Sequence, residues 1–204
     1  MEVNNLPEIT IPFRGWYEEH RRFTVTFTPG ITTLVGKNGS GKSSMVNEIR
    51  EYLKKKEIPV YYYEQREMGR RSASSFVLGG SVEETGNYCN SSEGERIIVS
   101  LSYSIQRIKQ FLIKHKDDEM VFVLFDGLDS GLSINLIRDL QDIFELILKD
   151  FPNLFIINTT NNYEFTKDSR CIIAKNGKDI KFNTYDDFVN LITKKDPVKR
   201  TKKG

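Results

Sequence analysis

The chain has 204 residues, of which 38% are hydrophobic and 28% charged, and its formal net charge is +2. This length fits one large domain and this composition can fill a core, which excludes a wholly disordered chain. The longest apolar run, residues 120–125, is far shorter than the roughly 20 residues of a membrane-spanning helix, and the N-terminus lacks a signal-peptide pattern. Cys89 and Cys171, without a CxxC pair, indicate neither a disulfide framework nor a zinc site. We therefore expect a cytoplasmic protein with no membrane partner.

Positive charge gathers at the C-terminal end of the sequence. Residues 193–204 carry six Lys or Arg residues against one Asp, a net charge of +5, so the other residues carry −3. A basic end of this kind is either a solvated terminus or an electrostatic arm for a phosphate backbone. We interpret residues 1–193 as one domain and residues 194–204 as a basic tail, the candidate contact with DNA.

Strands and helices alternate along the chain. Hydrophobic periodicity predicts strands at residues 9–13, 23–27, 31–35, 60–63, 120–125 and 154–157, and a hairpin of residues 170–174 with 180–182. It predicts helices over residues 43–56, 97–112, 133–147 and 184–192. This alternation indicates an α/β sandwich with a mostly parallel central sheet and an N-terminal antiparallel β region. Residues 64–92 are rich in Gly and Ser without a helical period, and we interpret residues 64–113 as a reduced second lobe.

The sequence from Gly36 to Ser43 matches the phosphate-binding pattern G-x-x-x-x-G-K-S/T and lies between a predicted buried strand and a predicted helix. Glycines allow successive backbone N–H groups to surround an anion, and the helix N-terminus adds a partial positive charge. Lys42 can reach the β- and γ-phosphates of ATP, and the Ser43 hydroxyl can ligate Mg²⁺. The predicted nucleotide-binding residues are Gly36, Asn38, Gly39, Ser40, Gly41, Lys42, Ser43 and Ser44.

Asp126 ends the apolar strand over residues 120–125. A carboxylate at the C-terminal end of a parallel strand, beside a phosphate loop, can orient Mg²⁺ through water. The alternative is an Asp that merely caps the turn after the strand. We predict Asp126 and Ser43 as metal-binding residues.

Four segments, in the order in which the family has them, resemble motifs of ABC-type ATPases, especially the RecF and SMC-like DNA-repair heads, an AAA-domain class of ATP-binding proteins. Residues 36–43 look like the Walker A loop, and residues 91–96, SSEGER, look like the signature motif LSGGQ or LSGGE. The strand that ends in Asp126 resembles Walker B, and residues 129–133 resemble the D-loop region. As a small standalone form, the chain also resembles ATPases of phages and mobile elements of Gram-positive bacteria.

The resemblance implies a P-loop NTPase fold and a homodimer that forms around ATP and Mg²⁺. It implies that Ser92 and Gly94 contact the γ-phosphate held by the second subunit. The simpler interpretation is a helix cap, because Ser92 with Glu95 three residues later is also a capping box. Gln65 is the candidate for the glutamine that contacts the metal in this family, although it lies early in the chain.

The sequence departs from the family at the positions that activate water. Gly127 stands where the family has the catalytic Glu, and Thr160 and Asn161 stand where it has the switch His. Ser133 replaces the Asp of the D-loop, and residues 64–92 leave no room for coiled-coil arms. Asp129 is the candidate replacement base, as is Glu93 from the opposite subunit. We therefore expect slow or absent hydrolysis.

These observations favour an ATP-binding switch in DNA repair or recombination, or in a phage- or defence-related complex, that signals to a partner protein or to DNA. Two alternatives stay open. A transporter-type nucleotide-binding subunit would need a helical subdomain, which residues 64–92 do not offer. A P-loop kinase or phosphotransferase of a small molecule would use an arginine-bearing lid, for which Arg66, Arg70 and Arg71 are available.

Overall fold

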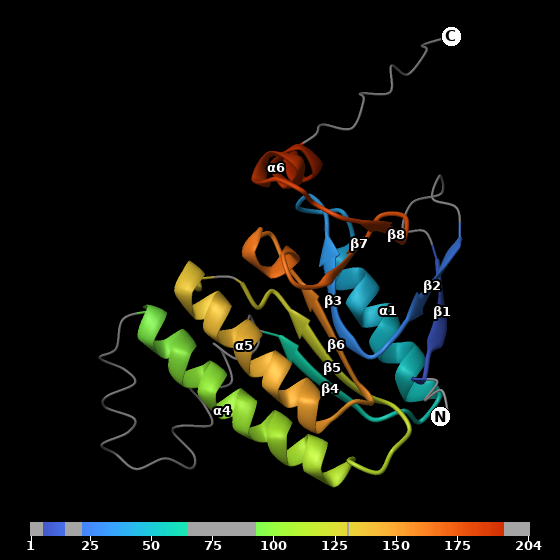
Figure 1. Cartoon of the computed structure of the whole chain (residues 1–204). Coiled ribbons are helices and arrows are strands. Elements are labelled where there is room, and N and C mark those ends of the chain that lie inside the picture. The colour runs from blue at the N-terminus through green and yellow to red at the C-terminus, as the bar shows by residue number, and fades with distance from the viewer. Residues whose placement is uncertain (1–5, 15–21, 65–92, 130, 194–204) are drawn as a thin grey trace, which may run out of the picture.

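The computed structural model describes residues 6–14, 22–64, 93–129 and 131–193, and a six-stranded sheet lies at its centre (Figure 1). The strands of this sheet are β3 (Gly30–Val35), β4 (Val60–Glu64), β5 (Val121–Asp126), β6 (Leu154–Thr159), β7 (Arg170–Ile173) and β8 (Lys178–Ile180). Their order is β4-β5-β6-β3-β7-β8. Neighbouring strands are parallel except β7 and β8, which are antiparallel. The predicted α/β fold with a mostly parallel central sheet is confirmed.

The central strands β5 and β6 are buried on both faces of the sheet. The first five residues of β5 and all six residues of β6 are buried. Their sequences, VFVLFD and LFIINT, show no alternation between apolar and polar residues until their last positions. Such continuous apolar runs are typical of parallel strands that have other layers packed on both faces.

One face of the sheet is covered by α1 (Lys42–Lys55), and a small antiparallel sheet packs on the far side of this helix (Figure 1). The small sheet consists of β1 (Ile9–Phe13) and β2 (Phe23–Phe27), as the sequence predicts. Alternate residues of both strands are buried and form one cluster with four buried residues of α1. These residues are Ile11, Phe13, Val25 and Phe27 of the strands and Met45, Val46, Ile49 and Leu53 of the helix. Both faces of α1 are therefore used for packing.

The opposite face of the sheet is covered by α4 (Glu93–Lys114) and α5 (Ile134–Asp150), which lie side by side (Figure 1). Each helix buries residues spaced three, four or seven apart: Leu101, Ile108 and Leu112 in α4, and Ile137, Leu140 and Phe144 in α5. These residues pack on alternate side chains of β5 and β6. Ser133 caps α5, because its Oγ accepts a hydrogen bond from the Leu136 N–H at 3.3 Å. From Leu101 onward, α4 belongs to the same core as the central sheet.

The C-terminal part of the described chain differs from the sequence-based expectation in three places. The second strand of the hairpin occupies residues 178–180 and not 180–182, because the turn closes at Gly177, whose N–H bonds to the Ile173 carbonyl, and pairing resumes at once with Lys178 opposite Ile173. Strand β6 continues to Thr159, two residues beyond the predicted end. A short 3₁₀ helix, η1 (Glu164–Thr166), follows it. The predicted final helix is confirmed as α6 (Tyr185–Thr193), and the Thr184 hydroxyl accepts from the Asp187 N–H at 3.2 Å.

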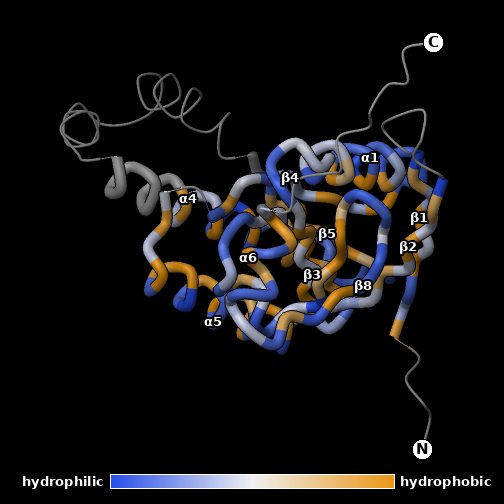
Figure 2. Tube along the Cα trace, turned by 90° about the horizontal axis from the view of Figure 1, so that it is seen from above, coloured by the Kyte–Doolittle hydropathy of each residue, from blue (hydrophilic) through white to orange (hydrophobic). Residues whose placement is uncertain are grey.

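Hydrophobic residues gather around β3 and β5 in the middle of the fold (Figure 2). Within the described ranges, none of the helices combines the length and the apolar character that crossing a membrane requires. The Gly- and Ser-rich segment that follows β4 and the basic tail at residues 194–204 lie outside the described residues.

Candidate functional site

The candidate site lies where the carboxyl ends of β3, β5 and β6 meet. Because β6 pairs in parallel with both β3 and β5, these three strands end at the same edge of the sheet. Leu34 of β3 lies opposite Thr159 of β6, and Phe125 of β5 lies opposite Asn158. The phosphate-loop motif follows β3, and Asp126 ends β5. Ligands of open α/β sheets bind at this edge.

The backbone of the loop needs its glycines. Gly36, Gly39 and Gly41 have φ values of +148°, +77° and +94°, which residues with a side chain rarely adopt. A Cβ atom at Gly36 would lie 2.5 Å from Ser40 Oγ. The Ser40 N–H donates to the Lys37 carbonyl at 3.1 Å and closes the loop. The loop therefore turns back on itself only with the glycines of the motif.

Helix α1 begins directly after this loop. Gly41 is its N-cap residue and offers no side-chain hydrogen bond to the first turn. The N–H groups at the start of a helix have no partners within the helix, and together with the helix dipole they attract anions. The first turn also contains no acidic residue that would compete for them. This combination suits a phosphate group.

Lys42 projects its ammonium group over the loop. Its Nζ donates to the Gly36 carbonyl at 2.7 Å, to the Lys37 carbonyl at 3.2 Å and to Asn161 Oδ1 at 2.9 Å. Burial lowers the pKa of this ammonium, and the carboxylates of Asp129 and Asp126 act in the opposite direction. A positive charge thus lies between the loop and two carboxylates.

Asp126 is held from two sides by hydroxyl groups. Its Oδ1 accepts hydrogen bonds from Ser43 Oγ at 3.0 Å and from Thr159 Oγ1 at 2.8 Å. Thr159 Oγ1 in turn accepts from the N–H of Gly127 at 2.9 Å. Thr159 is buried, with 3% of its surface exposed, so its hydroxyl finds its partners within the site.

The oxygen atoms of this site suit Mg²⁺. Among the described residues, no group of three or more His, Cys, Asp or Glu side chains could hold a metal alone. Mg²⁺ is commonly bound by one or two carboxylates, with water and the phosphates of the ligand completing its shell. Ser43 and Asp126, which touch each other here, provide one hydroxyl and one carboxylate of that kind. The donor set therefore fits a phosphate-bound magnesium ion.

Asp129 contacts the loop that follows β6. Its Oδ2 accepts hydrogen bonds from Thr160 Oγ1 at 2.9 Å and from the Asn161 N–H at 2.7 Å. Thr160 is buried, with 1% of its surface exposed, whereas Asn161 is exposed. These contacts fix the backbone that presents Asn161 to Lys42. The role of Asp129 as a replacement base stays a prediction.

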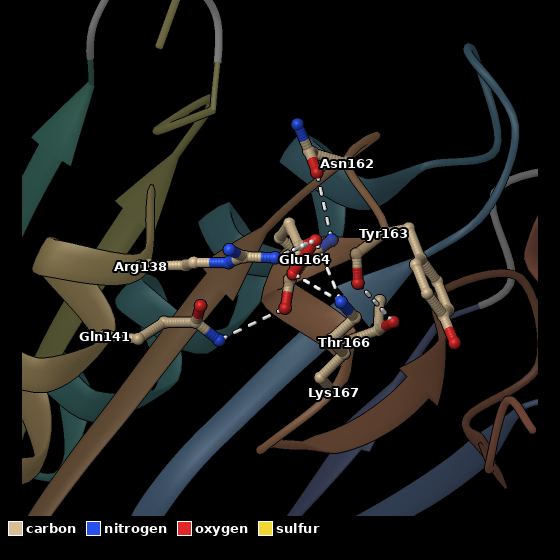
Figure 3. A network of polar contacts seen from close by, with 7 residues as sticks. All are labelled: Arg138, Gln141, Asn162, Tyr163, Glu164, Thr166 and Lys167. Carbon is tan, nitrogen blue, oxygen red and sulfur yellow. Dashed lines mark hydrogen bonds and ion pairs between the residues drawn. The ribbon is translucent and has the colours of Figure 1, made fainter. Parts of the chain in front are cut away.

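The same loop is anchored to α5 by a network around Glu164 (Figure 3). The Glu164 N–H donates to Asn162 Oδ1 at 2.9 Å, and the Asn162 N–H donates to Thr160 Oγ1 at 2.8 Å. The Glu164 carboxylate accepts from Lys167 at 2.7 Å and from Arg138 of α5 at 3.2 Å. Gln141, also from α5, donates to the Glu164 carbonyl at 3.1 Å. The hydrogen bond from Lys167 is the main cause that lowers the pKa of Glu164.

The structure brings together most of the residues that the sequence singles out. The residues at one edge of the sheet are Gly36, Asn38, Gly39, Ser40, Gly41, Lys42, Ser43, Ser44, Asp126 and Asp129. Gly94 lies in the first turn of α4. Gln65 and Ser92 lie outside the described residues. Their predicted contacts with the metal and with the phosphate stay predictions.

Two contributions to the site were not foreseen from the sequence. Thr159 orients Asp126, and Asn161 holds Lys42. The available signals were the polar residues 158–162 directly after the apolar residues of β6, and the place of Asn161 where the resembled family has its switch His. These signals become specific only when the neighbours of β6 in the sheet are known.

Proteins similar to this chain are found among solved structures. No protein-family model matches the chain, and no curated protein matches it significantly. Among solved structures, the chain is similar to MJ1267, an ATP-binding cassette of an ABC transporter, in its ADP conformation. The two share 14% sequence identity with a TM-score of 0.47, over 92% of this chain and 96% of that chain.

The Glu164 network predicts a pH-dependent contribution to stability. Because the pKa of Glu164 is lower in the folded protein than its ordinary value of 4.5, the stabilisation is present above that value. It is lost as the pH falls through the folded pKa. Glu164→Gln should lower the free energy of unfolding by about 0.5–1 kcal/mol at pH 7, a modest value because the side chains of Arg138 and Lys167 are 58% and 40% exposed to solvent. The deficit should shrink below about pH 4.5 and vanish in stronger acid.

Urea unfolding of both proteins at pH 7, 5, 4 and 3 measures this difference. Glu145→Gln, an exposed change on α5, the helix that carries Arg138, is the matched control and should leave stability nearly unchanged at every pH. A Glu164→Gln deficit of the same size at pH 3 and pH 7 would show that the ionised carboxylate is not the stabilising form.

Proposed function

We propose that this chain is a cytoplasmic, ABC-type head domain that binds ATP with Mg²⁺ and dimerises around it. The observation that carries the proposal is the contact of Ser43 with Asp126, directly beside Lys42 and the glycine loop. The proposal is supported because a glycine loop, an ammonium group and a hydroxyl–carboxylate pair lie together at one edge of a parallel sheet. The order of the sequence motifs supports the ABC-type assignment.

Each residue has a distinct role in this proposal. The N–H groups of the loop and of the first turn of α1 receive the phosphates, and Lys42 contacts the β- and γ-phosphates. Ser43 and Asp126 would hold the metal through their hydroxyl and carboxylate oxygens. Thr159 keeps the Asp126 carboxylate in one orientation through the hydrogen bond that it donates. When bound, Mg²⁺ would neutralise part of the negative charge of the phosphates.

Lys42→Ala tests the site directly. The variant lacks the ammonium group that faces the phosphates, so we expect at least a tenfold loss of ATP affinity, measured by calorimetry. A tenfold loss corresponds to about 1.4 kcal/mol. Lys55→Ala, at the opposite end of α1, is the matched control and should bind ATP as the wild type does. Equal ATP affinity of the Lys42→Ala variant and the wild type would show that the loop is not the nucleotide site.

Slow or absent hydrolysis is part of the proposal. Gly127 follows Asp126 and offers no carboxylate to activate water. A positioned general base contributes about 10²- to 10⁴-fold to a rate. Asp129 is the proposed substitute, but one of its oxygens already accepts two hydrogen bonds from the loop after β6. We therefore expect the protein to bind ATP but to hydrolyse it slowly or not at all.

Turnover by the wild type should lie below about 1 s⁻¹, at or under the low end of enzyme rates. Gly127→Glu should raise it if the surrounding geometry is productive. Gly127 has a φ of +75°, so a side chain there strains the backbone by about 1–2 kcal/mol, although its Cβ would meet no atom within 4 Å. Gly127→Ala carries the same strain without the carboxylate and is the control in both melting and ATPase assays. A folded wild type with a rate of tens per second would contradict slow hydrolysis.

Dimerisation should depend on ATP and not on ADP. In the resemblance, Ser92 and Gly94 contact the γ-phosphate on the second subunit, and α4 begins at Glu93, directly between them. Ser92→Arg should keep ATP binding but block the dimer through bulk and charge. Light scattering after size exclusion, without nucleotide, with ADP and with ATP plus Mg²⁺, measures this. If the variant still forms ATP-dependent dimers as the wild type does, the signature assignment is wrong and the capping box is the only remaining interpretation of Ser92.

The biological setting that we propose is a RecF- or SMC-like switch in DNA repair or recombination, or in a phage- or defence-related complex. The net charge of +5 in residues 193–204 supports contact with DNA or an acidic partner protein. The alternatives give different results in the same assays. A small-molecule kinase would form ADP only when an acceptor is added. A transporter-type subunit would also dimerise with ATP but would need a membrane partner.

A further inference from the structure

The hydrogen-bonding capacity of Lys42 is fully used within the protein. A lysine ammonium has three N–H donors and no acceptor. The three acceptors here are the carbonyls of Gly36 and Lys37 and the side-chain oxygen of Asn161. A phosphate can receive a hydrogen bond from Lys42 only if one of these acceptors gives up its place. Ligand binding at this ammonium is therefore an exchange of partners.

Of the three acceptors, the Asn161 side chain is the one that can leave without rearranging the fold. The two carbonyls belong to the loop backbone, which the glycine conformations and the Ser40–Lys37 hydrogen bond determine. Asn161 is exposed, and its amide is carried by two rotatable side-chain bonds. Rotation of that side chain changes no other hydrogen bond of its amide oxygen within the described contacts.

The backbone that carries Asn161 is meanwhile held in place. Its N–H donates to Asp129 Oδ2 at 2.7 Å. The preceding Thr160 is buried and donates to the same oxygen, and its N–H bonds to the Leu34 carbonyl at 3.3 Å. The following residues are tied to α5 through Glu164 (Figure 3). The side chain of Asn161 can thus rotate while the loop keeps its position.

We propose that Asn161 is a specificity-determining residue that competes with the phosphates of the nucleotide for Lys42. Its amide oxygen holds the ammonium when no ligand phosphate is present, and a β- or γ-phosphate displaces it. The inference rests on the proposed nucleotide site. It predicts that Asn161 reduces affinity for ADP and ATP, which engage Lys42, and has no effect on AMP, which carries only the α-phosphate.

The charges around the ammonium determine how two substitutions should differ. Asp129 and Asp126 already face Lys42, and Asn161 is neutral. Asn161→Ala removes the competing acceptor, whereas Asn161→Asp replaces it by a charged acceptor, which forms a stronger hydrogen bond to an ammonium. The Asp variant also places a negative charge where a phosphate would bind. The two variants should therefore change affinity in opposite directions.

Calorimetry of the full chain with AMP, ADP and ATP, each with Mg²⁺, tests the proposal. We expect Asn161→Ala to bind ADP and ATP about 2- to 10-fold more tightly than the wild type, the range of one exchanged hydrogen bond. We expect Asn161→Asp to bind them at least tenfold more weakly. AMP affinity should stay the same in Asn161→Ala. Asn47→Ala, an exposed change on α1, is the matched control, and thermal melting verifies that each variant is folded.

The outcomes separate this inference from the proposed function. Weaker or unchanged ADP and ATP binding by a folded Asn161→Ala variant overturns the competition, since weaker binding would mean that the amide contacts the ligand favourably. If Lys42→Ala loses ATP affinity while Asn161→Ala behaves as the wild type, the site stands and the inference fails. If the wild type binds none of the three nucleotides, both fail. If Asn161→Ala bound AMP more tightly by the same factor as ADP, this result would also contradict competition between Asn161 and the phosphates for Lys42.

Discussion

The parallel pairing of β6 with both β3 and β5 is the constraint on which the candidate site depends. The phosphate loop follows β3 and Asp126 ends β5, so one strand separates them. Thr159, at the end of that strand, donates to Asp126, and Ser43 donates to it from α1. Two elements thus orient one carboxylate before any ligand arrives. Such preorganisation lowers the cost of binding, because the groups need not be ordered at that moment.

A second set of contacts extends from Lys42 to the surface of α5. It runs through Asn161, Asp129, Thr160, Asn162 and Glu164 to Arg138 and Gln141. Most of these contacts hold backbone, and only the one between Lys42 and Asn161 joins two side chains at the loop itself. Asp129 binds both Thr160 and Asn161, so it fixes the backbone on which the Asn161 side chain is carried.

Local patterns predicted the loop at residues 36–43, most strands and Asp126, because each depends on residues that are close in sequence. The roles of Thr159 and Asn161 could not be predicted in this way, since they depend on which strands flank β6. The same limit explains η1, which is held by Arg138 and Gln141 of a distant helix. The shifted hairpin strand has a local cause, because Gly177 closes the turn before Lys178. Here the sequence contained the turn signal, Gly177. The prediction placed the strand two residues too late because it followed the apolar residues Ile180 and Phe182.

Gly127 stands at the position of the missing base and also contributes to the orientation of Asp126. Its N–H donates to Thr159 Oγ1, and this hydrogen bond leaves the Thr159 hydroxyl proton for Asp126. The chain turns at this residue with a φ of +75°, a conformation that glycine adopts without strain. The position that would carry a base is therefore used to orient Asp126 through its backbone. A side chain added there would strain the turn that positions the Gly127 N–H group. Because this N–H group binds Thr159, and Thr159 binds Asp126, the strain would also affect the orientation of Asp126. In the proposed function, the contacts present at this edge therefore favour holding a phosphate and its metal over activating water.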